Sequence, residues 1–339
     1  MDFALTPDQL AFRDAVERFG REQLVPNWSQ AADDGNVFLT ASWTAMGGYG
    51  LLGLPFPEEY GGSGASAVDT CLAAEALGRA GVDAGTTLSM GAHTILCGVP
   101  IWKLGTEAQK RRYLPGLASG DLIGGFCLTE PGSGSDAAAM ATRAVRDGDS
   151  WVINGSKTWI TNGPTGHVFV VTAVTDPDAH PRSFGISTFL VDATTPGFRV
   201  GKKLDKLGCR TSPTSELFFE DMRVPADSML GPENMGFALV GKLILGWERT
   251  CLMAPALGGL WHGLATACRY MHQREQFGRP LASFQALQEK IADIRVAYET
   301  SWGLLYRVAD LLDRDEPVLV EAAILKTYLS EASVRCAAE

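Results

Sequence analysis

A single carboxylate stands in an apolar stretch of the sequence. Glu248 lies in the run Leu239 to Leu264, whose residues are almost all small or apolar. If this run is one helix, the residues three and four positions from Glu248 share its face, and all of them are apolar. An ionised carboxylate is costly to bury there, so we expect it to be paired, to have a raised pKa, or to face a cavity. Two interpretations follow: a structural ion pair with a nearby arginine, or a general base.

A second candidate is the segment Gly124 to Asp136, GGFCLTEPGSGSD, in which a hydroxyl, an acid and a Gly/Ser-rich turn follow a hydrophobic strand. Such a turn exposes backbone N–H groups and hydroxyl donors that can hold a polar ring edge or a phosphate. Most turns of this composition are only turns, so the segment alone is not specific.

The segment Lys157 to Gly163, KTWITNG, brings an indole and a hydroxyl onto an apolar strand. Strand side chains alternate, so Trp159 and Thr161 are expected on one face. A flat aromatic cofactor needs a flat wall and a donor at its edge, which these residues could provide. A tryptophan in the core is the alternative.

The segment Arg274 to Pro280, REQFGRP, places Arg274 and Arg279 near a glycine turn after a long helix. This arrangement suits a pyrophosphate, and an ordinary solvated helix end explains it equally well. The histidines and cysteines have no metal-ligand spacing, so no metal site is expected. No motif of a serine hydrolase, a P-loop or a dinucleotide fold is present.

The elements that must position these segments change in type along the chain. Helical spacing covers 1–120, and short β-rich runs fill 121–232, among them Val168 to Val174 and Ser215 to Val224. Helical spacing returns over 233–339, where Pro255 and the Gly258–Gly259 pair predict a kink beyond Glu248. We therefore expect a multidomain α+β protein: an N-terminal helical domain, a middle antiparallel β-domain and a C-terminal helical domain, with these boundaries.

Composition excludes several classes of function. The 339 residues are 46% hydrophobic and 20% charged, which is typical of a globular protein. The uninterrupted apolar runs fall short of the roughly 18 residues of a membrane span, and the N-terminus has no signal-like pattern, so a cytoplasmic protein without a membrane is expected. A net charge of -10 argues against nucleic acid, although Lys110–Arg112 and Lys202–Lys203 could bind anions locally or simply be solvated. Seven scattered cysteines indicate free thiols.

Taken together, these segments resemble the acyl-CoA dehydrogenase family over essentially the whole chain. The family's markers occur in order: PEEYGG at Pro57, LTEPGSGSD at Leu128, KTWITNG at Lys157, DKLGCRTSPTSELFFEDMRVP at Asp205 and REQFGRPLASFQ at Arg274. The resemblance implies a C-terminal four-helix bundle, FAD as cofactor, an acyl thioester as substrate, electron-transfer flavoprotein or a similar acceptor, and a homotetramer or dimer.

The resemblance also implies roles for individual residues. Thr129 and Thr161 would bind the edge of the flavin ring, and Trp159 would pack on the ring. Ser135, Leu245 and Arg249 would lie near the substrate, although Arg249 also suits a structural role. The full set of implied cofactor-binding residues is Phe126, Leu128, Thr129, Gly134, Ser135, Trp159, Ile160, Thr161 and, toward the FAD of a neighbouring subunit, Arg274, Gln276, Phe277 and Gln285.

Glu248 occupies the position at which isovaleryl-type and long-chain family members carry the catalytic base, within a Glu-Arg dipeptide. Glu248 is therefore expected to take the α-proton while flavin N5 accepts the β-hydride. The string GWERTCLMAPALG is also similar to dehydrogenases that act on prolyl or acyl groups tethered to carrier proteins, so the thioester bearer is either CoA or a carrier protein. The chain ends before the family's glycine-rich loop and final segment, so its C-terminal domain is expected to lack that segment.

Two rivals remain. One is a flavin oxidase or monooxygenase on the same fold. The other is a non-catalytic module that binds a thioester or a carrier protein.

Overall fold

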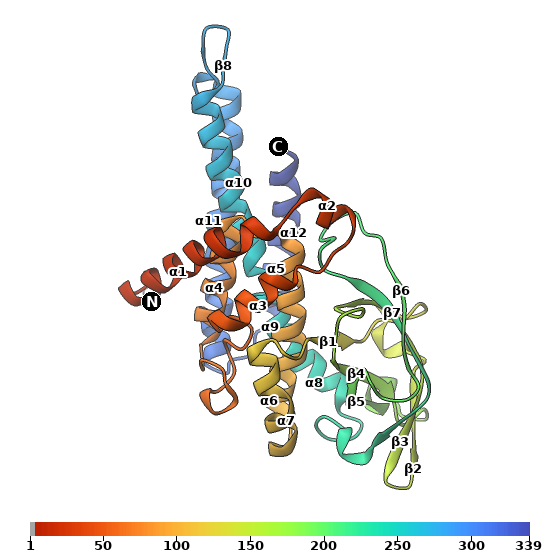
Figure 1. Ribbon diagram of the computed structural model, residues 1–339. Coiled ribbons are helices and arrows are strands. Elements are labelled where there is room, and N and C mark those ends of the chain that lie inside the picture. Colours follow the sequence, from red (N-terminus) through yellow and green to blue (C-terminus); the bar gives the residue numbers. More distant parts are fainter. Residues whose placement is uncertain (1–3) are drawn as a thin grey trace. The chain divides into compact units, whose positions relative to one another are not determined.

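The computed structural model describes residues 4–339, which form two compact units (Figure 1). The helical unit comprises the residues up to Asn27, Ser66–Thr87 and Gly246–Glu339. The β unit comprises Trp28–Ala65 and Leu88–Leu245. The order of helices, strands and helices along the chain is the one predicted.

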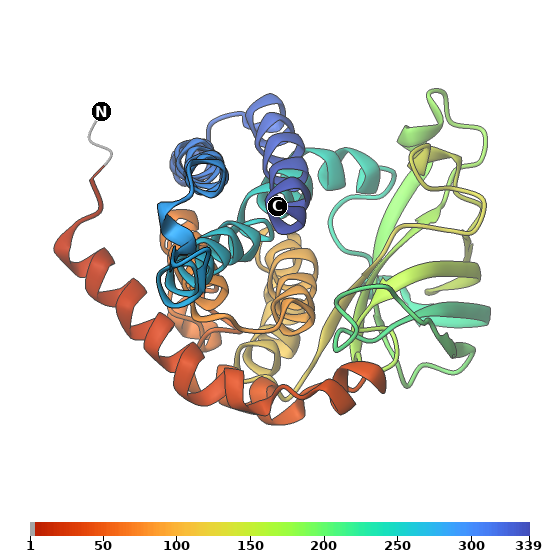
Figure 2. The same ribbon diagram turned by 90° about the horizontal axis from the view of Figure 1, so that it is seen from above.

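The helical unit is built from long helices. Its elements are α1 (Pro7–Phe19), the π-helix η1 (Gly20–Leu24), the short helix η2 (Val25–Asn27), α4 (Ala67–Ala80), α5 (Ala84–Gly91), α9 (Leu245–Cys251), α10 (Ala254–Gln273), β8 (Glu275–Gln276), β9 (Arg279–Pro280), the short helix η9 (Leu281–Ser283), α11 (Gln285–Asp313) and α12 (Leu319–Ala338). In sequence, α5 and α9 span the boundaries between the units. Helix α1 crosses the axes of α4, α10 and α11 rather than running along them (Figures 1 and 2).

Helix α1 begins where the sequence provides a cap. The Thr6 hydroxyl accepts a hydrogen bond from the Gln9 backbone N–H, and the Gln9 side chain accepts one from the Thr6 N–H. This reciprocal pair satisfies donors that the first turn leaves free. Thr6 and Gln9 therefore fix the start of α1.

Helices α4 and α10 approach each other closely through glycine. A Cβ atom added to Gly258 would lie 2.0 Å from the backbone oxygen of Glu75, and one added to Gly78 would lie 2.2 Å from that of Pro255. No side chain fits at either position. Gly258 therefore serves helix packing, and not the kink that the sequence predicted there.

The interruption in the helical run lies elsewhere. The helix α8 (Gly236–Leu239) continues as the π-helix η8 (Val240–Ile244) and then as α9, which carries Glu248. The chain leaves the helix at Leu252 and Met253, and α10 starts with Pro255 in its first turn. Proline lacks an N–H and is tolerated there. A break beyond Glu248 is thus confirmed, and Pro255 marks it.

The β unit carries a mixed sheet and short helices. Its elements are α2 (Gln30–Asp34), α3 (Thr40–Tyr49), η3 (Glu58–Tyr60), the π-helix η4 (Ala92–Gly98), α6 (Val99–Leu104), α7 (Glu107–Ser119), β1 (Gly124–Cys127), η5 (Ala137–Ala139), β2 (Arg143–Asp147), β3 (Ser150–Thr161), β4 (Val168–Val174), η6 (Arg182–Gly185), β5 (Ile186–Asp192), β6 (Phe198–Lys203), β7 (Thr214–Pro225), η7 (Ala226–Ser228), α8 and η8. The strand order is β1-β4-β2-β3-β7-β6, with β5 also paired to β4. The sheet is antiparallel as expected, except that β1 and one residue of β2 pair with β4 in parallel.

Strand β4 is buried on both faces, which explains its uninterrupted apolar sequence. Phe169 and Val171 belong to the core that β3 and β7 share. Val168 and Val170 pack on the other face against a cluster that includes Leu114 of α7. The helical layer and the sheet of this unit therefore share one strand as their common wall.

His93 links this helical layer to the start of the sheet. Its buried ring accepts a hydrogen bond from the Gly124 N–H at Nδ1 (3.0 Å) and contacts the Leu117 carbonyl at Nε2 (2.9 Å). Burial lowers the pKa of His93 to about 4, so the ring is neutral at physiological pH. The role of His93 is to fix the position of β1, the strand that leads into the polar turn.

One stretch meets the length and composition of a membrane span. Taken as one helix, Gly236–Gln273 has a window of mean hydropathy 1.2. Core helices of soluble proteins meet the same criterion, so this property alone does not indicate a membrane.

The contact between α4 and α10 generates a test with an internal control. Gly258→Ala should destabilise the protein by about 1–3 kcal/mol, because the added methyl group forces the helices apart. Gly259→Ala, one residue away with no heavy atom near its added Cβ, should stabilise it by about 0.5–1 kcal/mol through helix propensity. Urea unfolding measures both. Equal effects of the two substitutions would contradict the packing role of Gly258.

Candidate functional site

The two polar segments predicted from the sequence meet in the β unit. The Thr158 N–H on β3 donates a hydrogen bond to the Thr129 carbonyl (2.9 Å), so the turn after β1 is tied to the end of β3. Thr129 and Thr161 are both half-buried. The structure therefore brings the two threonines predicted to bind a ring edge into connected segments.

Trp159 is the most distinctive residue of this surface. Its side chain is 61% exposed, which rules out the alternative of a core tryptophan. Its backbone has φ of 60°, a left-handed conformation that is strained for a bulky residue, and the register of β3 against β7 shifts between Lys157 and Ile160. Backbone strain of this kind persists only where the surroundings impose it, and it clusters at functional sites.

The exposure of the neighbouring residues follows the strand. Ile160 is buried in the core between exposed Trp159 and half-buried Thr161, as alternation predicts. The Ile160 side chain belongs to the core, so the predicted cofactor contact of Ile160 would come from its backbone.

The polar turn is closed by its own backbone. Glu130 and Ser133 exchange hydrogen bonds of 3.0 and 3.1 Å, and Gly134 and Ser135 follow as exposed residues. Phe126 on β1 and Leu128 after it are half-buried. The exposed turn, the two threonines and the open indole face fit a flat ring with polar edges, the shape of the flavin that the resemblance implies.

Sequence reasoning missed two residues beneath this surface. The ammonium of Lys157 is fully buried and lies 2.9 Å from the carboxylate of Glu130. The available signal was a lysine inside an apolar strand, since lysine is almost never fully buried without a partner.

In the helical unit, Glu248 is half-buried on α9. Among the described residues its carboxylate makes no ion pair, which favours the interpretation as a general base over that as a structural pair with an arginine. Burial raises the pKa of Glu248, while the charges of Arg249 and Lys326 oppose that rise. Arg249 and Leu245, both predicted near the substrate, lie on the same helix and are half-buried.

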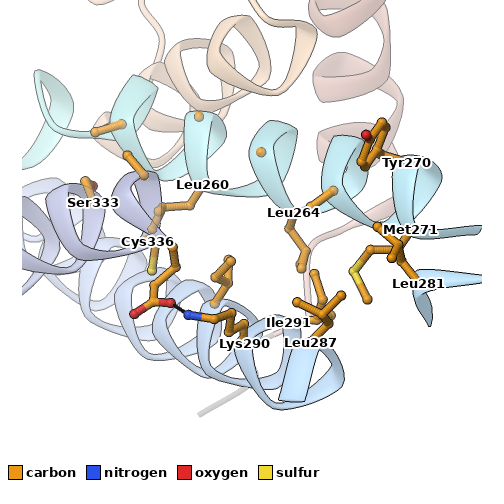
Figure 3. A pocket seen from close by; sticks show the side chains of 17 residues that line it. Leu260, Leu264, Tyr270, Met271, Leu281, Leu287, Lys290, Ile291, Ser333 and Cys336 are labelled. Carbon is orange, nitrogen blue, oxygen red and sulfur yellow. Dashed lines mark ion pairs between the residues drawn. The ribbon is translucent and has the colours of Figure 1, made fainter. Parts of the chain in front are cut away.

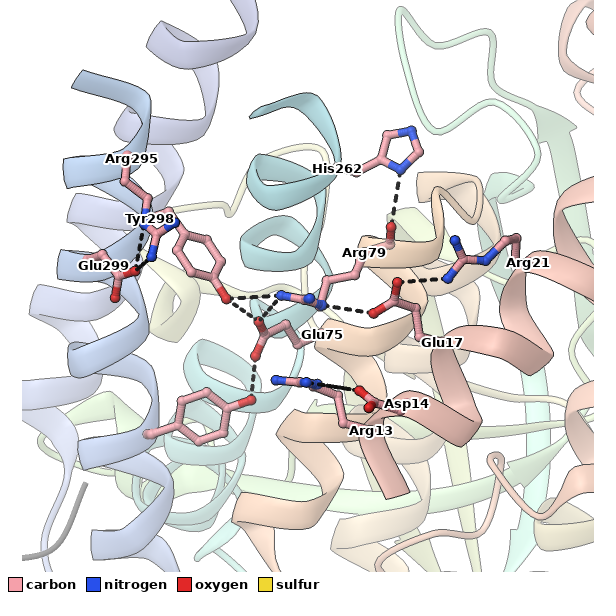
Figure 4. A network of polar contacts seen from close by, with 11 residues as sticks. Arg13, Asp14, Glu17, Arg21, Glu75, Arg79, His262, Arg295, Tyr298 and Glu299 are labelled. Carbon is pink, nitrogen blue, oxygen red and sulfur yellow. Dashed lines mark hydrogen bonds and ion pairs between the residues drawn. The ribbon is translucent and has the colours of Figure 1, made fainter. Parts of the chain in front are cut away.

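A second acid in the helical unit shows how a structural carboxylate is satisfied. Glu75 on α4 is buried and accepts hydrogen bonds from the hydroxyls of Tyr298 (2.7 Å) and Tyr306 (2.5 Å) (Figure 4). Arg79, one turn further along α4, lies 3.8 Å from Glu75 and donates to Glu17. Glu248 has no such set of partners among the described residues.

The residues predicted to reach a neighbouring subunit lie between the end of α10 and the start of α11 (Figure 1). Arg274, Gln276 and Phe277 lie on or beside the hairpin of β8 and β9, and Gln285 begins α11. All are exposed, and the Phe277 side chain is 92% exposed. Phe277 and Gly278 both have positive φ, as a tight hairpin turn requires.

Three residues of the two basic clusters make local contacts. Arg111 pairs with Glu107, Arg112 pairs with Asp192, and Lys203 donates to the backbone of Asn36. These contacts support solvated surface residues rather than anion sites. Within residues 4–339 no group of side chains is arranged to hold a metal ion, and the seven cysteines are free thiols.

An apolar cavity of about 620 Å³ lies in the helical unit between α10, α11 and the end of α12 (Figure 3). Leu260, Leu264 and Ile291 line it, together with the ion-paired Lys290 and Glu339. None of the predicted site residues lines this cavity, so it is separate from the candidate site.

Comparisons with known proteins agree with these observations. Three family models match in succession: acyl-CoA dehydrogenase N-terminal domain at 6–121, middle domain at 125–222 and C-terminal domain at 234–339. A short-chain specific acyl-CoA dehydrogenase of Clostridium acetobutylicum is 40% identical, over 98% of this chain and 86% of its own length.

Solved structures are similar over the same extent. The butyryl-CoA dehydrogenase of Megasphaera elsdenii has a TM-score of 0.93 and 38% identity, covering 99% of this chain and 87% of its own. The prolyl acyl carrier protein oxidase AnaB has a TM-score of 0.93 and 32% identity, covering 98% of this chain and 87% of its own. A structure of PigA with FAD and proline has a TM-score of 0.94 and 32% identity, covering 99% of this chain and 87% of its own.

The environment of Glu248 generates a stability test. Because the folded state favours the protonated carboxyl, Glu248 contributes stability at low pH and loses it as the pH rises through its raised pKa. Glu248→Gln cannot ionise, so at neutral pH it should be more stable than the native protein by about 0.5–2 kcal/mol. That gain should vanish toward about pH 4, where the native carboxyl is also protonated.

Urea unfolding at both pH values measures the difference, with the exposed Glu289→Gln as control. A Glu248→Gln protein that is less stable at neutral pH would show that the carboxylate has a stabilising partner.

Proposed function

Because the chain belongs to the acyl-CoA dehydrogenase family, we propose that it removes an α-proton and a β-hydride from a saturated acyl thioester, with Glu248 as the base. It is an FAD-dependent oxidoreductase. The α C–H bond next to a thioester carbonyl is a very weak acid. Its proton is removed best by a carboxylate that has a raised pKa and is not held in an ion pair. The observation that carries the proposal is the half-buried Glu248, whose carboxylate is unpaired among the described residues.

The residues of each unit have separate tasks in this reaction. Thr129 and Thr161 hold the edge of the cofactor ring, and Trp159 provides a flat wall for it. FAD, when bound, supplies the hydride acceptor. Glu248 takes the α-proton, and the apolar residues around it favour the protonated form that results. Ser135, Leu245 and Arg249 are proposed to contact the substrate, with Ser135 also close to the ring.

The proposal also covers the partners of the protein and its location. The exposed hairpin at Phe277, together with Gln285, supports a homo-oligomer, a tetramer or dimer, in which Arg274 and Gln276 reach the FAD of a neighbouring subunit. Electron-transfer flavoprotein or a similar protein is the proposed acceptor. The free thiols support a cytoplasmic location.

A second candidate function is oxidation of a carrier-bound acyl group with oxygen as acceptor. The similarity to AnaB, described as a prolyl acyl carrier protein oxidase, favours it. Identity is higher to the short-chain dehydrogenases, which supports a CoA thioester and a protein acceptor.

The substrate test is anaerobic visible spectroscopy of the FAD-loaded protein. Saturated short acyl-CoAs, and the same acyl groups on a carrier protein, are added in turn. Bleaching of the oxidised flavin band by one set identifies the thioester bearer, and rapid peroxide formation in air identifies an oxidase. A protein that binds no FAD, or a band that no thioester bleaches, would favour a non-catalytic binding module.

The base test is Glu248→Gln in the same assay. Loss of a positioned base should slow flavin reduction by about a hundredfold to ten-thousandfold, because the α-proton has no acceptor. FAD content and affinity should stay native, and Glu289→Gln should reduce at the native rate. Stopped-flow absorbance gives the rates. A native reduction rate in Glu248→Gln would assign the base elsewhere.

A further inference from the structure

The β unit contains a fully buried ion pair directly beneath the surface of Trp159 and Thr129. The Lys157 ammonium is 0% exposed, and the Glu130 carboxyl is 6% exposed. Removing two charges from water costs several kcal/mol for each ion, so a pair in this position needs further hydrogen bonds. Apolar residues of similar volume would fill the space at lower cost.

The Lys157 ammonium donates hydrogen bonds to acceptors on several segments of the chain. Besides Glu130 (2.9 Å), Lys157 Nζ donates to the Leu128 carbonyl (3.0 Å) and to the Thr172 hydroxyl (3.3 Å), and it lies 3.8 Å from the sulfur of Met140. These partners come from the strand end before the turn, from the turn itself and from β4. The position of the ammonium is therefore fixed by several separate segments.

The Glu130 carboxylate connects the pair to one further segment of the chain. Glu130 accepts hydrogen bonds from the backbone N–H groups of Ala141 (2.6 Å) and Thr142 (3.0 Å). Burial raises the pKa of Glu130, whereas the Lys157 charge and these donors lower it by a larger amount. The net shift of the pKa is therefore downward, and the carboxylate is ionised. One acid thus joins the turn to the segment that leads into β2.

Both charged residues are adjacent in sequence to residues of the candidate site. Glu130 follows Thr129, and Lys157 precedes Thr158, whose N–H bonds to the Thr129 carbonyl. Trp159 comes next, with its strained positive φ. Any displacement of the pair moves the turn and the bulge together, and that strain requires surroundings that hold it.

We propose that Lys157 and Glu130 are positioning residues that set the placement of Trp159 and Thr129 against the flavin, and so tune the cofactor. This inference rests on the proposed function. A buried ion pair contributes orientation rather than net stability, because apolar replacements can keep the fold but have no directional bonds.

The test separates positioning from folding. Lys157→Met leaves Glu130 as an uncompensated buried charge and should lower the melting temperature. The double variant Lys157→Met with Glu130→Leu removes both charges but leaves the buried Thr142 N–H without its acceptor, so it should recover part of that loss. Its visible circular dichroism and flavin midpoint potential should nevertheless stay shifted from native. Thioester-driven flavin reduction should stay about a hundredfold slower, the size of effect expected from a misplacement of about 1 Å.

A conservative variant and a matched control complete the experiment. Glu130→Gln keeps an amide oxygen for one backbone donor and should shift the same spectrum and potential in the same direction. Arg210→Met breaks the ion pair of half-buried Arg210 with exposed Asp205 in the same unit, outside the site segments, and should leave the flavin properties native.

A double variant or a Glu130→Gln protein with native dichroism, potential and reduction rate would overturn the positioning role while leaving the proposed function intact. Absence of FAD or of bleaching in the native protein would instead contradict the proposed function itself.

Discussion

The cost of removing a carboxylate from water constrains both units of this chain, and three acids meet it in different ways. Glu130 is compensated by the Lys157 charge and two backbone donors. Glu75 is compensated by two tyrosine hydroxyls and by Arg79 (Figure 4). Glu248 is left without a partner among the described residues, and its pKa rises instead. The first two arrangements hold structure in place, and the third leaves a group that can take a proton.

The proposed ring surface and the proposed base are formed by different local features. In the β unit the register of β3 against β7 shifts beside the exposed Trp159, and the buried ion pair of Lys157 and Glu130 begins at the residue before this shift. The short helix α9, which carries Glu248, follows the π-helix η8 of the β unit in sequence and ends at the break before Pro255. Both sites therefore depend on departures from regular geometry, which structures tolerate where surrounding contacts are numerous.

Much of this organisation could be predicted from the sequence. The periods of the apolar residues indicated the order of helices and strands, and the run Val168–Val174 is strand β4 with the bounds predicted. The polar segments at Thr129 and Trp159 were recognised because their residue types suit a ring edge. The pair of Lys157 and Glu130 was missed because its members are 27 residues apart, and only the fold brings them together. The positive φ of Trp159 depends on the register with β7, which no local pattern encodes. Gly258 was misread as a kink because its packing partner, α4, is distant in sequence.

The π-helix η8 has a consequence for helical phase. Each π turn accommodates one residue more than an α turn, so the residues after it are rotated by about 100° relative to a continuous α-helix. The face that Glu248 occupies therefore depends on the π geometry of Val240–Ile244 as well as on its own neighbours. Regular α geometry over that segment, with no residue lost, would turn the carboxylate to another face, whereas loss of one residue together with the π turn would leave it on its present face.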